Sequence, residues 1–202
     1  TVELTAQTLK VALESGIVLY HLRRFQDAGR ETDRAYGLLV ESGRVVDLAI
    51  CRTWQARSRH QVGNHGEAVR LATEATSLDP GNALPHAVLA LALLDLGQRP
   101  QAADAAGVSL SMAETAVGLY VRGRLGLEEG ASETALADLL RAEAIARCDR
   151  PEIRLAAARA HLALGSIHPA IEMLERAADE APDLPGVAAE LKTARARLPG
   201  KE

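Results

Sequence analysis

The stretch from Val62 to Asn82 reads VGNHGEAVRLATEATSLDPGN, and the turn residues within it decide the fold. Gly63 is expected to end a preceding helix, because glycine readily adopts the left-handed conformation of a helix C-cap. A second helix is predicted from about Gly66 to Ser77. The four residues 79–82, DPGN, then form a turn signature, and Asn82 can cap the helix after it. The stretch therefore predicts two helices joined by a tight turn, with a third helix following at once.

The same pattern recurs along the chain at a nearly fixed period. The turn glycines lie 34, 33 and 35 residues apart, and an alanine follows each of them five residues later. The glycines are Gly63, Gly97, Gly130 and Gly165, and the alanines are Ala68, Ala102, Ala135 and Ala170. A period of this size indicates stacked supersecondary units.

The spacing resembles the tetratricopeptide repeat, a helix–turn–helix unit of 34 residues. The resemblance implies an all-α protein: a right-handed α-α superhelix (solenoid) of about five helix–turn–helix repeats plus a C-terminal capping helix. A single domain is expected over residues 1–202. Its units are expected at about 9–42, 49–82, 83–115, 116–150 and 151–184, and its capping helix at about 186–198.

Two features set this chain apart from the family pattern. The first unit is degenerate, with LRRFQDA (residues 22–28) as its inter-helix turn and Ala28 as its alanine. The family's large aromatic residues are mostly replaced. The residues that stand where tryptophan is common are Ala12, Arg52, His86, Leu119 and Arg154.

Composition agrees with a helical protein and narrows the classes of function. The sequence is 48% hydrophobic but only 2% aromatic, and alanine and leucine, both strong helix formers, supply most of its apolar surface. The formal net charge of −4 does not indicate the excess of basic residues that is typical of nucleic-acid-binding proteins. The longest apolar run, residues 87–94, is too short to span a bilayer.

The cysteines and the start of the chain bear on the cellular compartment. Cys51 and Cys148 would lie about three repeats apart in such a stack, beyond disulfide reach. The sequence begins at Thr1 without methionine and has no signal-peptide pattern. The compartment therefore stays open. A cytoplasmic location is slightly favoured, and a periplasmic location follows if a leader has been removed.

The resemblance also implies a binding surface, because the first helix of each pair, the A helix, lines the concave face of such a stack. Inward family positions place three arginines in one row among apolar residues. The candidate partner-binding residues are Trp54, Arg57, His60, Leu91, Tyr120, Arg124 and Arg159. Arginine pairs carboxylates through a planar fork, so the row predicts an acidic peptide or protein partner with apolar side chains.

Each candidate has a structural alternative. The arginines could be solvated or paired within the protein, and Trp54 and Tyr120 could fill space between units instead of anchoring a partner. His60 and His65 are five residues apart, a spacing that places them on different faces of a helix. No Cys/His spacing matches a zinc site, so neither a metal nor a cofactor is expected.

Catalytic motifs are not found in the sequence, which has no nucleophile elbow, Walker loop or phosphate-binding glycine fingerprint. The sequence favours a non-catalytic scaffold or adaptor that binds a protein or peptide segment. The alternative is the recognition or regulatory domain of a larger enzyme or of a secretion or assembly protein. A third hypothesis is self-association through the apolar face of the unit at 83–115.

Overall fold

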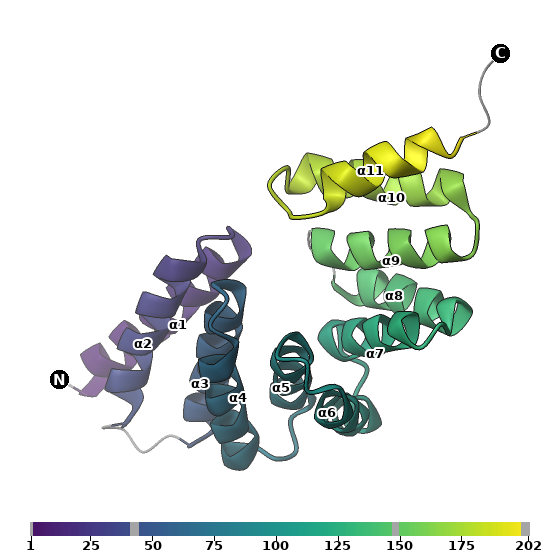
Figure 1. Ribbon diagram of the computed structural model, residues 1–202. Coiled ribbons are helices and arrows are strands. Elements are labelled where there is room, and N and C mark those ends of the chain that lie inside the picture. Colours follow the sequence, from purple (N-terminus) through teal and green to yellow (C-terminus); the bar gives the residue numbers. More distant parts are fainter. Residues whose placement is uncertain (1, 41–44, 147–149, 199–202) are drawn as a thin grey trace. The chain divides into compact units, whose positions relative to one another are not determined.

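The computed structural model describes residues 2–40, 45–146 and 150–198, with side chains described from residue 7 onward. These residues form helices and turns, and no strand is present among them, which confirms the all-α expectation. The helices follow one another in pairs whose two members pack together (Figure 1). Their bounds are α1 (Val2–His21), α2 (Phe25–Val40), α3 (Val45–Gln61), α4 (His65–Leu78), α5 (Ala83–Asp95), α6 (Arg99–Met112), α7 (Ala116–Glu128), α8 (Ser132–Ala146), α9 (Pro151–Ala163), α10 (Ile167–Glu180) and α11 (Val187–Ala196).

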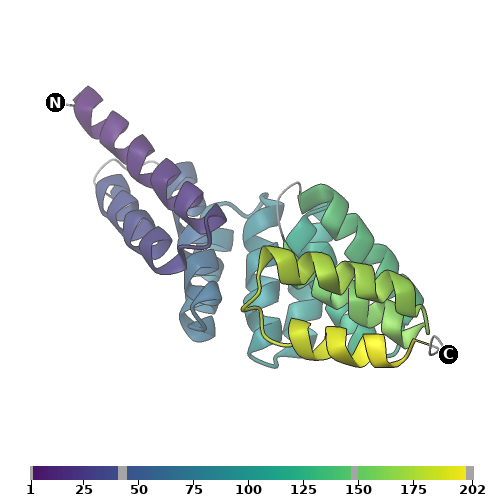
Figure 2. The ribbon, with the colours of Figure 1, turned by 90° about the horizontal axis from the view of Figure 1, so that it is seen from above.

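The chain divides into two compact units, Thr1–Glu114 and Thr115–Glu202, each of which contains helix pairs. The first unit holds the pairs α1–α2, α3–α4 and α5–α6. The second holds the pairs α7–α8 and α9–α10 and the single helix α11, which packs along α10 (Figure 2). A single domain over the whole chain stays a prediction.

The turn inside each pair is built around a left-handed residue. Gly63, Gly97, Gly130 and Gly165 have φ angles of 80°, 77°, 80° and 75°. A Cβ added at any of them would meet no atom within 4 Å, so the backbone conformation and not a lack of space selects glycine. In the first pair Arg23 takes this conformation instead, with φ of 59°. Arg23 therefore stands where the other repeats have their turn glycine.

The alanine of each pair is buried, and a Cβ added to Gly126 on α7 would lie 3.3 Å from Ala135 Cβ on α8. The five alanines are 0% or 1% exposed: Ala28, Ala68, Ala102, Ala135 and Ala170. Glycines of two A helices permit equally close contacts. A Cβ on Gly123 would lie 2.7 Å from Leu139 Cγ, and one on Gly16 would lie 2.7 Å from Thr32 Cγ2. Small residues thus set how closely the two helices of a pair approach.

Consecutive A helices also pack on one another within each unit, α1 with α3, α3 with α5, and α7 with α9. This contact gives each unit a continuous A-helix face. At the C-terminal end, Val187 and Ala194 of α11 are buried in one apolar cluster with Leu174 of α10 and Leu155 of α9. The expected capping helix is therefore present. In the part of the chain that the structure describes, no helix is both long and apolar enough to cross a membrane.

Cys51 on α3 is a buried structural residue. Its thiol donates to the Thr32 carbonyl oxygen at 3.1 Å, and burial raises its pKa to about 12. Such a thiol is protonated at neutral pH and unreactive. Cys148 lies outside the described residues, and the absence of a bridge between the two cysteines stays a prediction.

Candidate binding surface on the A helices

The A-helix face of the first unit carries a stack of two aromatic rings and one guanidinium. Trp54 and Arg57 lie one helical turn apart on α3, and Tyr20 comes from the last turn of α1. The Arg57 guanidinium carbon lies 4.1 Å from the Trp54 ring centroid and 4.5 Å from the Tyr20 ring centroid. The two rings meet edge-on, with their centroids 5.4 Å apart. The stack fixes three side chains from two neighbouring repeats in one arrangement.

This arrangement changes the role expected of Arg57. The residue is 8% exposed, so its guanidinium is held against the two rings and is not a solvated rung of an open groove. Cation–π contacts of this kind contribute about 0.5–2 kcal/mol each. Trp54 is only half-buried, so its ring packs between repeats and still presents part of its surface.

His60 lies in the last turn of α3 and reaches the last residue of α5. Its Nε2 lies 2.6 Å from Asp95 Oδ2, and both side chains are half-buried. The contact joins the A helices of two consecutive repeats. Leu91, one turn before Asp95 on α5, is also half-buried.

His65 joins this pair, contrary to the expectation that it lies on a different helix face from His60. The two imidazole rings meet with centroids 4.9 Å apart. The reason is that a turn separates the residues: α3 ends at Gln61, Gly63 is left-handed, and α4 begins at His65. The chain reverses between the two histidines, so helical spacing does not apply to them. Burial and the neighbouring His60 lower the pKa of His65, and Asp95 acts in the opposite direction.

The A helices of the second unit hold the remaining candidates. Arg124 lies one turn after Tyr120 on α7, with its guanidinium carbon 5.5 Å from the tyrosine ring centroid. Arg159 on α9 pairs with Glu190 of the capping helix, with Nη2 2.6 Å from Oε1. Arg159 therefore already has a carboxylate partner within the protein. These residues and those of the first unit belong to separate units, and a single row of arginines stays a prediction.

Two arginines that the sequence did not single out as functional form ion pairs with neighbouring helices. Arg52 is half-buried and forms an ion pair with Glu74 of α4 at 2.8 Å, and its guanidinium lies 3.5 Å from the Tyr36 ring centroid of α2. Arg154 is buried and pairs with Glu143 of α8 and Glu180 of α10. Both stand where the family commonly has tryptophan. A charge at an apolar repeat position is the signal that could have indicated a buried ion pair.

Helix pairs joined by a left-handed turn, an interlocked alanine in each pair and a stack closed by a capping helix define an α-α solenoid of the tetratricopeptide-repeat type. No family model matches the sequence, and no curated protein matches it. Solved structures do match, and three of them show the range of the likeness.

TTC0263, a thermophilic tetratricopeptide-repeat protein of Thermus thermophilus, is 23% identical with a TM-score of 0.71, over 93% of this chain and 99% of that one. A chain of the APC/C hetero-tetramer Cut9–Hcn1 is 16% identical with a TM-score of 0.75, and the match covers 93% of this chain and 36% of that one. PilW, a type IV pilus biogenesis factor, is 14% identical with a TM-score of 0.62, over 95% and 88% of the two chains. At these identities the likeness establishes the fold.

Proposed function

We propose that this chain is a non-catalytic scaffold that binds a peptide or protein segment on the A-helix face of its repeats. The observation that carries the proposal is the stack of Tyr20, Trp54 and Arg57. It holds a half-exposed tryptophan in a fixed position on that face. Rigid aromatic residues backed by arginine are typical anchors in protein interfaces, because little side-chain freedom is lost when a partner binds them.

The chemistry of the face favours a partner segment with apolar side chains and carboxylates. Trp54 and Leu91 offer half-exposed apolar surface in the first unit. Tyr120 and Arg124 offer a ring and a half-exposed cation in the second. Of the remaining candidates, Arg57 acts by holding Trp54, and Arg159 requires a partner carboxylate to replace Glu190.

The proposal is tested by selecting peptides from a displayed library against the full chain and measuring the affinity of a selected peptide by fluorescence anisotropy. Leu91→Asp is expected to weaken binding about tenfold or more at both low and high salt, since it removes apolar contact. Arg124→Glu is expected to weaken binding mainly at low salt, because exposed charges are screened over about 10 Å at 0.1 M ionic strength.

Arg70→Glu is the matched control. Arg70 is an exposed arginine on α4, the second helix of its pair, where it pairs with Glu67 and Glu74 of the same helix. Its reversal should leave the affinity unchanged. Each variant is first checked for wild-type helix content by circular dichroism. Equal affinity for wild type, Leu91→Asp and Arg124→Glu would show that the partner binds another surface.

The alternative proposal is that the chain is the recognition domain of a larger enzyme or of a secretion or assembly protein. PilW supports it only to the extent that this fold serves in a pilus biogenesis factor. The full reading frame distinguishes the two proposals, because a catalytic or membrane-anchoring segment in the same frame would favour the alternative.

A further inference from the structure

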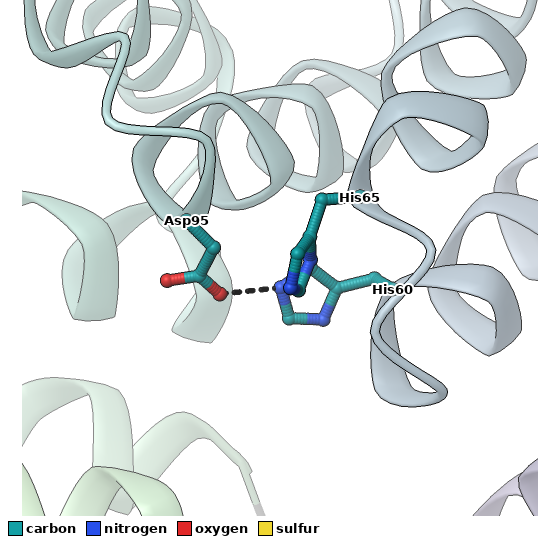
Figure 3. Close-up of side chains that lie close together, drawn as sticks. All are labelled: His60, His65 and Asp95. Atoms are coloured by element: carbon teal, nitrogen blue, oxygen red, sulfur yellow. Dashed lines mark hydrogen bonds and ion pairs between the residues drawn. The ribbon is translucent and has the colours of Figure 1, made fainter.

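We propose that His60, His65 and Asp95 form a binding site for a divalent transition-metal ion, with zinc as the best-suited metal. The ligand atoms that the three side chains offer all lie within 4.8 Å of one another (Figure 3). This site goes beyond the proposed binding of a peptide, and nothing in that proposal requires it.

The local fold brings the three residues together from three helix ends. His60 lies in the last turn of α3, His65 is the first residue of α4, and Asp95 is the last residue of α5. The turn around the left-handed Gly63 reverses the chain between the two histidines. The packing of α5 on α3 then places Asp95 against them. The site therefore depends on the repeat architecture and not on a local sequence motif.

The donor set suits a borderline transition metal. Two imidazoles and one carboxylate are typical protein ligands of zinc, and three protein ligands leave a fourth position for water. Zinc binds such ligands at about 2.0–2.2 Å, so the ligand atoms of a tetrahedral site lie about 3.3–3.6 Å apart. His60 Nε2 and Asp95 Oδ2 lie 2.6 Å apart, so a small separation of the two atoms would reach that spacing. His65 would approach by a side-chain rotation.

A second observation points to a missing ligand. Nδ1 of His65 is buried and has no hydrogen-bond partner among the described residues. Buried polar atoms are nearly always paired, so an orphaned imidazole nitrogen beside a histidine and a carboxylate calls for an explanation. A metal ion that accepts this lone pair supplies one.

The helix ends also favour a cation at this place. The C-terminal ends of α3 and α5 both meet at the cluster, and the carbonyl groups of a helix C-terminus attract positive charge. The N-terminus of α4 opposes them. Two helix ends and the Asp95 carboxylate thus favour a cation here, and one helix end disfavours it. A bound ion would tie α3, the A helix of one repeat, to α4 and α5, and so stiffen the A-helix face of the first unit.

The test is a titration of the full chain, free of any polyhistidine tag and stripped with a chelator, with zinc chloride in a calorimeter. One zinc ion per chain is expected to bind with a Kd in the micromolar range or tighter. A zinc concentration one hundred times the Kd should raise the Tm by about 5–10 °C. His65→Gln and Asp95→Asn should each weaken binding by at least about tenfold.

His86→Gln is the matched control, because His86 is a half-buried histidine on α5 in the same unit whose Nε2 contacts the Pro80 carbonyl oxygen, away from the cluster. It should bind zinc like the wild type. A readout that needs no variant is protection of His60 and His65 from diethyl pyrocarbonate by zinc, mapped by mass spectrometry. The proposal is overturned if the wild type shows no saturable zinc binding, if His65→Gln binds equally well, or if zinc leaves both histidines unprotected.

Discussion

Arg154 on α9 donates through Nε to Glu143 on α8 at 2.7 Å, so a buried cation of one repeat is held by a carboxylate of the repeat before it. Glu180 on α10 accepts a hydrogen bond from Nη1 of the same guanidinium. Three consecutive helices thus share one charged contact at a position where the family commonly has an aromatic residue. The apolar filling of that position has been replaced here by an ion-paired clamp.

The first prediction concerns this clamp. Arg154→Ala should lower the free energy of unfolding, because it removes the buried guanidinium that Glu143 and Glu180 share. Removing one partner of a fully buried ion pair costs about 3–5 kcal/mol. Because Glu143 and Glu180 are partly exposed, the expected loss of stability is about 3 kcal/mol or less. Urea denaturation followed by circular dichroism measures it.

Arg176→Ala is the control for the clamp. Arg176 lies 3.6 Å from the same Glu143 but is exposed. Its removal should change the free energy of unfolding by less than about 1 kcal/mol. An equal loss from the two variants would show that Arg154 contributes no more than a surface ion pair.

The second prediction concerns the turn residue Arg23. A left-handed conformation is strained for any residue with a Cβ, by about 1–2 kcal/mol. Arg23→Gly removes this strain and loses an exposed contact with Phe25, whereas Arg23→Ala loses the contact and keeps the strain. The glycine variant should therefore be more stable than the alanine variant by about 1 kcal/mol in urea denaturation. Equal stability of the two would mean that this turn is not left-handed in solution.

The third prediction concerns the interlocked alanines. Ala102 is fully buried on α6, which packs on α5, so Ala102→Leu should lower the free energy of unfolding by about 1–3 kcal/mol through overpacking. The neighbouring Ala103 is exposed on the same helix. Ala103→Leu should be nearly neutral in the same thermal or urea denaturation experiment. A neutral Ala102→Leu would contradict the observed packing of the pair.

The fourth prediction concerns pH. Burial lowers the pKa of His161, whose Nδ1 is buried without a hydrogen-bond partner in the described structure. Below the unfolded-state pKa of about 6.5 the unfolded chain therefore binds more protons than the folded one, and stability falls as the pH drops through that region. His65, whose pKa is also lowered, acts in the same direction.

The fourth prediction is checked by denaturation at several pH values between about 7 and 5, the range in which histidine titrates. His161→Gln should make the loss of stability toward low pH shallower than in the wild type. His168→Gln replaces an exposed histidine on the next helix and should leave the pH dependence as it is. If the stability of His161→Gln fell with decreasing pH as steeply as that of the wild type, His161 would not be the cause of the pH dependence.

The candidate binding surface shows which side-chain contacts can be predicted from the spacing of residues along a helix. Trp54 and Arg57 lie one turn apart on a single helix, as do Tyr120 and Arg124, and the structure has both pairs in contact. The expectation that His60 and His65 lie on different faces of a helix was wrong, because the chain reverses at a turn between them and their rings meet. The sequence alone does not pair Tyr20 with Arg57 or Asp95 with His60, because each partner lies on another repeat.

The sequence by itself determined the all-helical fold, the pairing of the helices and the places of the turns. These depend on local properties: a glycine at Gly63 or Gly165 is selected by its own φ angle, and an alanine at Ala102 by the small volume it occupies. Only the tertiary structure decided that the Arg57 guanidinium lies against the Trp54 and Tyr20 rings, and that His65 lies beside Asp95. Such contacts depend on how one helix is rotated and shifted against the next, and no spacing within a single helix encodes that.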